Sequence, residues 1–480
     1  MSNDLTIIQV NDSHGYLDLH QELFWAGDHA AYRGAGGYAR IATLLREARE
    51  ERPGAVLAFD NGDTIHGTYA AVKTEGRALV PILNSLAFDA MTAHWEFAYG
   101  PQQFKKLAAE LTYPMLAINC YEKGTDRLVF EPYTILEAGG LRVGAIGLAA
   151  TIVDKVMPAS FSEGLYFTLG NEELPGYIAR LRQEEQVDLI VLVSHLGFPQ
   201  EMKLAAEVDG IDVLLSGHTH NRLYRPALVN ETIVIQSGCH GSFVGRLDLE
   251  VEGGRVVDWK HRLMVVGEEM TPDGEVQEQV DAALAPYRQE QSQVVGHTET
   301  ALNRYTVLEA TMDNLLLQSL VELTGAEVAF SNGWRYGAPI PPGEITLNDL
   351  WNIIPVNPPV STCKLTGQEL WQMLEENLER TFAADPYDQM GGYVKRCLGL
   401  NLYFKVENPR AHRIQELFVR GERVRADQVY EAAFVTSQGV PAKYGSDRQS
   451  LATDAIEALR RYLVSNDPSW ADLRGTVVAV

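Results

Sequence analysis

Cysteine is scarce in this chain. The 480 residues include only four cysteines, and none of them stands in a Cys-x-x-Cys pair. This spacing fits no zinc ribbon and is typical of isolated buried thiols. The sequence therefore gives no reason to expect an oxidising compartment.

Long apolar runs and a targeting segment are also missing. No stretch approaches the ~20 consecutive apolar residues of a membrane helix, so no membrane span is expected. The chain begins Met-Ser-Asn-Asp and enters a strand-like run at Leu5, without the basic and apolar regions of a signal peptide. We expect a cytoplasmic protein; the alternative is an exported protein already trimmed of its leader.

Basic residues are much fewer than acidic residues. The chain has 40 Lys and Arg residues against 64 Asp and Glu residues, for a formal net charge of −24. Such a chain would repel a nucleic-acid backbone or an anionic membrane, so neither is expected as a partner. A small anionic substrate would need local positive charge, which bound divalent metal ions can supply. Both a monomer and a dimer are compatible with this composition.

The first half of the chain repeats one pattern. A short apolar strand ends in a polar loop that contains glycine, often with a helix before the next strand. This predicts a layered α/β domain, with a site formed by the loops at the carboxyl ends of its strands. The expected strands are 5–10, 55–59, 90–92, 115–118, 141–148, 188–193, 211–215 and 233–236, and the expected helices are 37–51 and 80–86.

The pattern changes near residue 265. Residues 270–293 are polar, with apolar residues at helical spacing, and predict a connecting helix that Pro286 kinks. A chain of this length is too long for one core. We therefore expect a domain at 1–268, a connecting helix at 269–295 and a second domain at 296–480. In the second domain we expect helices at 311–324, 366–382 and 450–465, and strands at 327–331, 400–405 and 414–419.

Aspartate and histidine recur in the loops after the first-domain strands. Two neighbouring divalent ions need a bridging carboxylate and further imidazole or carboxylate ligands. Asp63 is the natural bridge, and His218 and His220 point to the same side of an extended loop. A single histidine of this kind is more often a structural residue, but a whole series at successive strand ends predicts a dinuclear metal centre. The series is Asp12, His14, Asp63, His195, His218 and His220.

Short motifs in both halves of the chain are similar to one known family. They include Asn-Asp-Ser-His-Gly at 11–15, Gly-Asp-Thr at 62–64, Ser-His-Leu-Gly at 194–197, Gly-His-Thr-His at 217–220, Ser-Asn-Gly-Trp-Arg at 331–335 and Leu-Thr-Gly at 365–367. With them the chain resembles the calcineurin-like metallophosphatases, and within these the two-domain 5′-nucleotidases. The resemblance implies an α/β fold: a four-layer β-sandwich metallophosphatase domain flanked by helices, followed by an α+β 5′-nucleotidase-type C-terminal domain.

The resemblance also implies the chemistry. Its family hydrolyses phosphate esters by in-line attack of a metal-activated water. Carried over position by position, one metal takes Asp12, His14, Asp63 and His220, and the other takes Asp63, His195, His218 and residue 94. Two divalent ions are expected, and manganese or zinc in particular, because an imidazole at position 94 favours a softer ion than magnesium.

Residues 93–98 depart from the family. The family reads Gly-Asn-His-Glu-Phe-Asp, whereas this chain reads Ala-His-Trp-Glu-Phe-Ala. His94 then stands at the position of a ligand asparagine, Trp95 replaces a catalytic histidine, and Ala98 replaces the aspartate that orients it. His94 is expected to be a metal ligand or a catalytic group. The stretch is similar to the thiosulfohydrolase branch of the superfamily, which hydrolyses a sulfonate from a cysteine-bound persulfide.

The second domain offers candidates for contacts with a nucleotide-like substrate. Arg335, near Asn332, has the guanidinium fork that suits a phosphate or sulfonate. Tyr387 and Tyr444 are candidates for stacking on a base, although each fits a surface or core position at least as well. Arg396 and Arg448 are further candidates for the anion, and His240 for the rim of the metal cluster or for a structural role.

Three functions are compatible with these observations. The leading hypothesis is a dinuclear metal-dependent hydrolase that cleaves a nucleotide-like phosphomonoester, with low activity on standard 5′-nucleotides because Trp95 and Ala98 replace the usual pair. The second is hydrolysis of a sulfur ester or S-sulfonate, as in the thiosulfohydrolases. The third is a binding or regulatory protein with a degenerate site, against which the complete series of six ligands argues.

Overall fold

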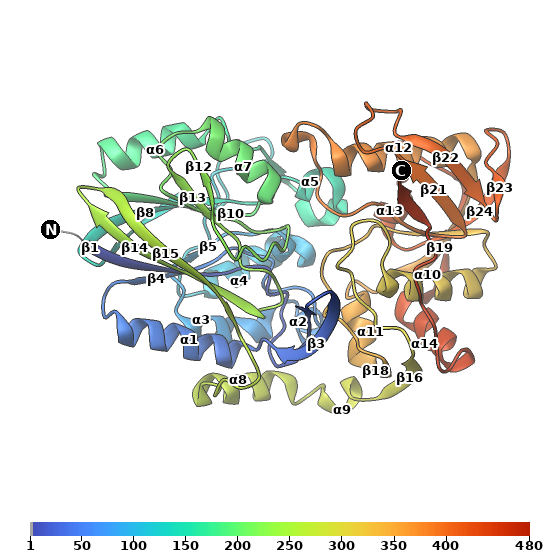
Figure 1. The fold of residues 1–480 in the computed structure, drawn as a ribbon, viewed down its shortest axis with the longest axis horizontal. Coiled ribbons are helices and arrows are strands. Elements are labelled where there is room, and N and C mark those ends of the chain that lie inside the picture. Colours follow the sequence, from blue (N-terminus) through green and yellow to red (C-terminus); the bar gives the residue numbers. More distant parts are fainter. Residues whose placement is uncertain (1–2) are drawn as a thin grey trace. The chain divides into compact units, whose positions relative to one another are not determined.

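The computed structural model describes residues 3–480, which form two compact units (Figure 1). Unit 1 contains the described residues up to Glu22 and Arg33–Pro286, and unit 2 contains Leu23–Tyr32 and Tyr287–Val480. The excursion at 23–32 is the tip of a hairpin of β2 (His20–Ala26) and β3 (His29–Ala35), which the sequence pattern did not predict.

Unit 1 is built on two sheets. The first contains β1 (Asn3–Val10), β4 (Val56–Asp60), β5 (Ala90–Met91), β14 (Phe243–Glu252) and β15 (Arg255–Val265), in the order β15-β14-β1-β4-β5. The second contains β7 (Tyr133–Ala138), β8 (Leu141–Leu148), β10 (Leu189–Ser194), β11 (Val213–Leu215), β12 (Ala227–Val229) and β13 (Thr232–Ile235), in the order β12-β13-β11-β10-β8-β7. Strands β1, β4 and β5 are parallel, as are β8, β10, β11 and β13.

The two sheets share one hydrophobic core. Alternate residues of the strands, such as Ile7, Phe59 and Val191, form a fully buried cluster to which both sheets contribute. The neighbouring residues Ile190 and Leu192 point to the other face and pack against helices. This alternation explains why the strands read as continuous apolar runs, because both faces of each central strand are buried.

Helices cover both outer faces of the sandwich. The face of the second sheet packs against α6 (Leu174–Gln183) and α7 (Phe198–Glu207). On the side of β4, α1 (Tyr38–Glu51) contacts that strand and packs with α3 (Val80–Leu86) and α8 (Gly274–Leu284) (Figure 1). Unit 1 therefore has the predicted four layers, helix-sheet-sheet-helix.

One predicted strand of unit 1 is wrong. Residues 115–118 form only isolated bridges, from Met115 to Met91 and from Leu116 to Glu131. The backbone changes partner at almost every residue, because Leu116 N donates to Met91 O at 2.8 Å and Ile118 N donates to Gly147 O at 3.0 Å. A segment that bonds to three neighbours in turn cannot form a regular ladder.

Shorter elements complete unit 1. They are α2 (Tyr69–Lys73), α4 (Pro101–Glu110), α5 (Val153–Val156), β6 (Cys120–Glu122), β9 (Leu165–Phe167) and the 3₁₀ turns η1 (Arg77–Leu79), η2 (Trp95–Tyr99) and η3 (Ala159–Ser162). After α8 the chain continues as α9 (Arg288–Gln291), with Pro286 between the two helices. The polar segment at 270–293 is thus two helices in place of the single one expected.

Unit 2 has two mixed sheets and a two-stranded ribbon. One sheet contains β17 (Val328–Ser331), β19 (Pro359–Thr366), β20 (Arg396–Leu398), β24 (Val429–Phe434) and β25 (Ser446–Asp454), in the order β20-β17-β24-β19-β25. A second sheet has the order β23-β22-β21-β26 and contains β21 (Leu400–Phe404), β22 (Ile414–Val419), β23 (Glu422–Arg423) and β26 (Val477–Ala479), and β16 (Val294–Thr298) pairs with β18 (Gly343–Thr346).

The helices of unit 2 mostly follow the sequence pattern. They are α10 (Thr311–Thr324), α11 (Leu347–Ile353), α12 (Gly367–Phe382), α13 (Thr436–Gly439) and α14 (Ala455–Ser465), with a 3₁₀ turn η4 (Pro386–Asp388). The side chain of Thr366 accepts from Glu369 N in a capping box that starts α12. The predicted helix at 450–465 is wrong at its start, because residues 450–454 pair with β19 and Asp454 caps the helix.

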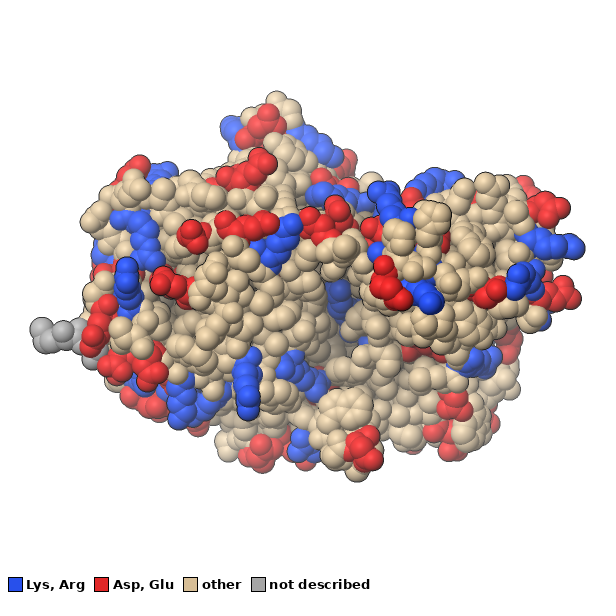
Figure 2. All heavy atoms as spheres, turned by 45° about the horizontal axis from the view of Figure 1, so that its top comes forward, with Lys and Arg blue, Asp and Glu red and all other residues tan. Residues whose placement is uncertain are grey.

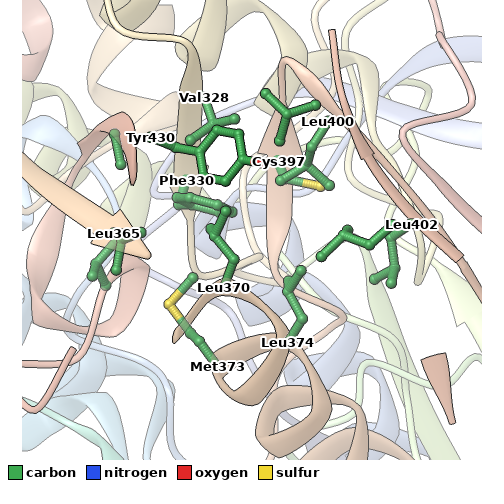
Figure 3. Packing of buried hydrophobic residues seen from close by; sticks show 14 of the residues in the cluster. Val328, Phe330, Leu365, Leu370, Met373, Leu374, Cys397, Leu400, Leu402 and Tyr430 are labelled. Carbon is green, nitrogen blue, oxygen red and sulfur yellow. The ribbon is translucent and has the colours of Figure 1, made fainter. Parts of the chain in front are cut away.

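A hydrophobic core holds α12 against the strands of unit 2. Leu370, Met373 and Leu374 of α12 pack on Phe330 and Leu402, all almost completely buried (Figure 3). The apolar residues of α12 recur at helical spacing, which explains why its extent was readable from the sequence.

Lys395 is a charged residue in the interior of unit 2. Its side chain is 4% exposed, and Nζ donates to the backbone oxygen of Gln438 at 2.6 Å. Burial, reinforced by the charge of Arg380, lowers the pKa of Lys395 from 10.5 to about 7. Because the folded pKa lies below the unfolded one, the unfolded chain binds more protons between pH 7 and 10.5. This lysine therefore makes the free energy of unfolding rise with pH across that window.

We expect Lys395→Met to stabilise the protein at pH 6.5 more than at pH 9.5, with a difference of about 3 kcal/mol. Urea denaturation at the two pH values measures this difference. Lys443→Met is the matched control, because Lys443 is exposed and pairs with Glu376. It should change the stability by no more than about 0.5 kcal/mol at either pH. An equal effect of Lys395→Met at both pH values would contradict the prediction.

Candidate metal centre

The parallel strands of unit 1 present aspartate and histidine at their carboxyl ends. In such sheets the loops beyond these ends form the site. All the side chains are buried except that of His220, which is half-buried. They are Asp12 and His14 after β1, Asp63 after β4, His94 after β5, His195 after β10, His218 and His220 after β11, and His240 after β13.

The backbone is strained at many of these positions. Asp12, His14 and Asp63 have φ between 49° and 56°, and His218 and His220 have φ of 70° and 58°. Residues other than glycine rarely adopt this left-handed region, and such strain concentrates at functional sites. Gly217 precedes His218 in this loop. Any larger residue at position 217 would clash, because its Cβ would lie 2.8 Å from His195 Nδ1.

The structure brings together one group that we name site A. It consists of Asp12, His14, Asp63 and His220, whose potential ligand atoms lie within 4.8 Å of one another. His220 Nε2 is 3.2 Å from Asp12 Oδ1 and 3.2 Å from His14 Nε2. His14 Nε2 is 3.6 Å from Asp63 Oδ2.

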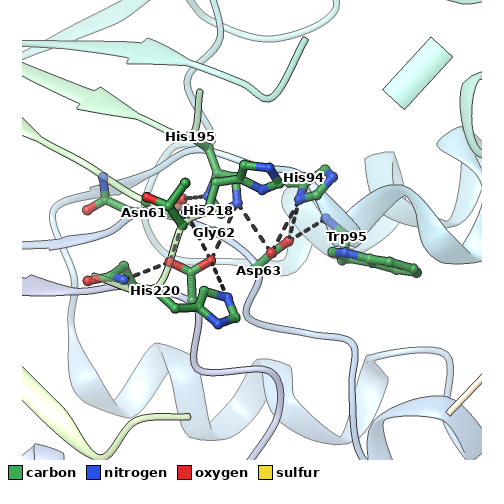
Figure 4. A network of polar contacts seen from close by, with 12 residues as sticks. Asn61, Gly62, Asp63, His94, Trp95, His195, His218 and His220 are labelled. Carbon is green, nitrogen blue, oxygen red and sulfur yellow. Dashed lines mark hydrogen bonds and ion pairs between the residues drawn. The ribbon is translucent and has the colours of Figure 1, made fainter. Parts of the chain in front are cut away.

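A second group, site B, shares Asp63 with site A. It consists of Asp63, His94, His195 and His218, again within 4.8 Å (Figure 4). His94 Nδ1 is 3.1 Å from Asp63 Oδ1, and His195 Nε2 is 3.3 Å from Asp63 Oδ2. The two oxygens of one carboxylate thus face both groups, which is the arrangement of a bridging ligand. All seven predicted ligands fall in these two groups.

Hydrogen bonds to backbone oxygens determine two tautomers. His14 Nδ1 is 3.2 Å from His66 O, and His195 Nδ1 is 2.5 Å from Asn61 O. A carbonyl oxygen only accepts, so both rings carry a proton on Nδ1 and, when neutral, a lone pair on Nε2. These lone pairs face carboxylates, and the buried Nε2 atoms of His94 and His195 have no hydrogen-bond partner among residues 3–480. A divalent cation fits such a donor set.

The electrostatics of the pocket also favour a cation. Burial would raise the pKa of Asp63, but His94, His195 and His14 lower it well below its ordinary value. Burial lowers the pKa of His195, but the carboxylates of Asp63 and Asp12 outweigh it and raise the pKa to about 10. Without a metal, the two carboxylates would require a proton on this ring.

Glu96 holds the loops that carry Asp63 and His94. Its buried carboxylate accepts from Thr64 N at 2.6 Å, from His94 N at 2.7 Å and from Asp63 N at 3.3 Å. One side chain therefore fixes the ends of two neighbouring strands. The sequence did not predict this role. In the run at 93–98, Glu96 is simply a residue that the chain shares with the family it resembles.

Trp95 lies against the protein interior. Its ring stacks on that of His66, with centroids 4.9 Å apart and planes 20° apart. Its backbone N–H donates to Asp63 Oδ1 at 2.7 Å (Figure 4). Trp95 is 6% exposed. Its backbone N–H thus contacts the centre through Asp63, and Ala98 offers no polar side chain.

A third group, the His240 group, contains His20, Glu22 and His240. Its potential ligand atoms also lie within 4.8 Å of one another. His240 Nδ1 is 3.0 Å from Glu22 Oε2, and Arg222 Nη2 donates to Glu22 Oε1 at 2.9 Å. The sequence indicated His240 as a rim residue but missed Glu22 and Arg222, which stand in no motif.

The predicted substrate residues lie in unit 2. Arg335 Nη2 donates to Gly392 O at 3.1 Å and its guanidinium lies 5.3 Å from the Tyr393 ring centroid. Asn332 Nδ2 donates to Gln438 Oε1 at 3.2 Å. Tyr444 is buried in the core and its hydroxyl donates to Glu376 at 3.0 Å, whereas Tyr387 is half-buried in the turn η4. Their roles as substrate contacts remain predictions.

Arg396 and Arg448 are engaged by their surroundings. Arg396 Nε lies 3.1 Å from Asp313 Oδ2, and Arg304 Nη2 lies 3.1 Å from Asp313 Oδ1, with all three side chains buried. Arg448 donates to backbone oxygens, among them that of Val440 at 2.7 Å.

The negative charge is dispersed on the face drawn in Figure 2, where acidic and basic side chains alternate. An anion that binds on that face would therefore need basic residues or bound cations close to its own site.

Among the described residues, no helix has the length and apolar character needed to span a bilayer.

Comparisons with known proteins agree with this fold. Residues 294–436 match the family model of the 5′-nucleotidase C-terminal domain. The chain is 26% identical to the trifunctional nucleotide phosphoesterase YfkN of Bacillus subtilis, over 94% of the chain but only 32% of that protein. It is 23% identical to a 5′-nucleotidase of Vibrio cholerae, over 97% of the chain and 91% of that protein.

Two solved structures share the fold. The Thermus thermophilus sulfate thiohydrolase SoxB superposes with a TM-score of 0.92 and 24% identity, covering 100% of this chain and 97% of the other. A 5′-nucleotidase precursor from Thermus thermophilus superposes with a TM-score of 0.87 and 23% identity, covering 99% of both chains.

Together these findings show that residues 294–436 match a 5′-nucleotidase C-terminal domain and that the whole chain shares the two-domain fold of these solved structures. They confirm the resemblance to the two-domain 5′-nucleotidases and the fold class, and the relatives that carry the name 5′-nucleotidase support the prediction of a hydrolase.

Proposed function

We propose that this chain binds two divalent metal ions and hydrolyses a small anionic ester, a nucleotide-like phosphomonoester. The observation that carries the proposal is Asp63, whose carboxylate belongs to both four-residue groups. A single bridging carboxylate between two N/O ligand sets is what a two-metal hydrolase requires.

The residues of the chain have distinct roles in this proposal. Asp12, His14 and His220 hold one ion with Asp63, and His94, His195 and His218 hold the other. When bound, such ions lower the pKa of a water molecule and neutralise charge on the ester oxygens. Glu96 and the backbone oxygen of Asn61 orient the ligands. His94 acts as a ligand, because its Nδ1 points at Asp63 from within site B.

Manganese or zinc suits these two sites. Site B offers three imidazoles and one carboxylate, and imidazole favours zinc and other transition metals over magnesium. Site A has an equal number of imidazoles and carboxylates, which also suits manganese.

The proposal of a nucleotide-like substrate rests on the names of the relatives. Those from Vibrio cholerae and Bacillus subtilis are named for activity on nucleotides. We propose that Arg335 and Asn332 of unit 2 contact the substrate, with Tyr387 and Tyr444 as further candidates. The chain is 23–26% identical to these relatives, so the substrate itself calls for measurement.

Metal analysis followed by a substrate screen tests the proposal. The purified protein should contain two equivalents of manganese or zinc per chain, and the metal-restored protein should release phosphate from a panel of phosphomonoesters. Because Trp95 and Ala98 carry no imidazole or carboxylate, turnover of AMP should stay below about 10 s⁻¹. A protein with one equivalent or none, or without hydrolysis of any ester, would contradict the proposal.

A second candidate is hydrolysis of a sulfur ester or S-sulfonate. The observation that favours it is the pair His94 and Trp95, which place an imidazole in site B and an indole in the interior. The same metal-restored protein should then release sulfate from a protein or small-molecule S-sulfonate. Phosphate release without sulfate release decides for the first candidate, and the reverse result for the second.

A further inference from the structure

The proposed ligands come from the two sheets of unit 1 in unequal shares. Site A takes three ligands from the loops of the first sheet and one, His220, from a loop of the second. Site B takes two ligands from each sheet, Asp63 and His94 from the first, and His195 and His218 from the second. A residue that fixes the loops of the second sheet should therefore affect site B more than site A.

Glu201, in the first turn of α7, joins two loops of the second sheet. Its side chain is 0% exposed. Its Oε1 accepts from Leu196 N at 3.1 Å, and its Oε2 accepts from the hydroxyl of Ser216. Leu196 follows His195 in the loop after β10, and Ser216 begins the loop after β11. One buried carboxylate thus ties the loop of one ligand histidine to the loop that carries two others.

Gln236 determines the direction of these hydrogen bonds. Its side-chain oxygen accepts from the backbone N–H of Asn221, which can only donate, so the orientation of the amide is fixed. Its Nε2 donates to Ser216 Oγ at 2.7 Å, and the Ser216 hydroxyl directs its own proton to Glu201. Both oxygens of Glu201 therefore face donors. A glutamine at position 201 would place its NH₂ group against one of these donors.

Glu96 has the corresponding place in the first sheet of unit 1. Its carboxylate accepts from Thr64 N in the loop after β4 and from His94 N in the loop after β5. Each sheet of the sandwich thus has a buried glutamate that joins two neighbouring strand ends. Because site B draws equally on both sheets, both glutamates support its ligands.

We propose, on the basis of the two-metal function proposed above, that Glu201 is a positioning residue of the metal centre and acts chiefly on site B. It holds the loops of His195 and His218, and Ser216 links it to Gln236 beneath the second loop. Site A depends on these loops for one ligand only and retains its three ligands from the first sheet. Loss of Glu201 therefore weakens the ion in site B and largely spares the ion in site A.

A purely structural role is the competing explanation for this buried glutamate. Asp212 provides the comparison, because it joins the same two strands, β10 and β11, at their other ends. Its carboxylate accepts from Ile190 N at 2.6 Å and from the guanidinium of Arg182, one residue before β11 begins. If Glu201 only stabilised the fold, Glu201→Gln and Asp212→Asn would have similar effects on the metal centre.

Calorimetric titration of the metal-free protein with Mn²⁺ tests the proposal. Glu201→Gln should weaken the ion that His94→Ala loses, the one in site B, by about 10- to 100-fold and change the other affinity by less than about threefold. Ser216→Ala should weaken the same ion about tenfold. The double variant should lose less than the two single variants predict together, because the two side chains belong to one network. Asp212→Asn, the matched control, should keep both affinities within about threefold of wild type.

Hydrogen exchange of the metal-free protein tests the inference apart from metal binding. Glu201→Gln should speed exchange of the backbone amides at 194–198 and 216–221 about tenfold or more, with no change at 61–64 and 93–96. A wild type with fewer than two ions would contradict the proposed function, and the exchange pattern would still decide whether Glu201 holds these loops. Unchanged Mn²⁺ affinities in both Glu201→Gln and Ser216→Ala, equal weakening of both ions, an equal defect in Asp212→Asn, or unchanged exchange at 194–198 and 216–221 would each overturn the inference.

Discussion

Replacing Asp63 with asparagine should abolish tight binding of both metal ions and lower kcat/KM by about 10³-fold or more. Asp63 is the only residue common to sites A and B, so its loss removes a ligand and a negative charge from each. Metal ions contribute several kcal/mol to such reactions, and about 4 kcal/mol corresponds to this factor. Metal content per chain and steady-state kinetics with the best substrate of the screen measure the effect.

Asp60→Asn is the matched control at the end of the same strand. Asp60 Oδ1 accepts from Thr64 Oγ1 at 2.6 Å and from Gly62 N at 3.0 Å, and it belongs to neither site. Burial raises the pKa of Asp60 to about 7, so the neutral amide resembles its protonated form. This variant should retain both ions and most of the activity. His94→Ala should lose one ion of the two. An Asp63→Asn protein with two equivalents of metal would exclude the bridging role.

Leu374→Ala should lower the free energy of unfolding by about 2–5 kcal/mol, the cost of a large cavity in a packed core. Leu374 is fully buried on α12, where it packs with Leu370, Met373 and the strands of unit 2 (Figure 3). The folded fraction should still contain two metal ions, because all proposed ligands belong to unit 1.

Gln372→Ala is the control for this experiment. Gln372 lies on the same helix but is exposed, so its substitution should change the stability by less than about 0.5 kcal/mol. Denaturation by urea, followed by tryptophan fluorescence and metal release, measures both variants. A cost below about 1 kcal/mol for Leu374→Ala would show that the core around α12 relaxes around the missing side chain.

Much of unit 1 was predictable because its strands are buried on both faces. The apolar runs at 5–10, 55–59 and 188–193 correspond to β1, β4 and β10 within one or two residues at each end. The helix predicted at about 311–324 coincides with α10, since its apolar residues follow the helical period and Gly325 ends it in a left-handed conformation.

Other elements depend on contacts that are distant in sequence. Residues 115–118 look like a strand locally but bond in turn to β5, to Glu131 and to β8. Residues 450–454 have a helix-compatible composition, yet pairing with β19 draws them into β25. Strands β14 and β15 were not predicted. In β15, exposed and half-buried residues alternate, so its sequence lacks a clear apolar pattern.

The amino-acid sequence by itself determined which residues stand at the strand ends and how the run at 93–98 differs from its relatives. These are local properties, since a strand and the loop after it are read from a few consecutive residues. Only the tertiary structure decided that Asp63 faces both groups, that Trp95 packs on His66, and that His240 meets Glu22. Glu22 and His240 lie 218 positions apart in the chain. Their contact arises because the fold brings the β2-β3 hairpin beside the loop after β13, and side-chain types carry no signal of it.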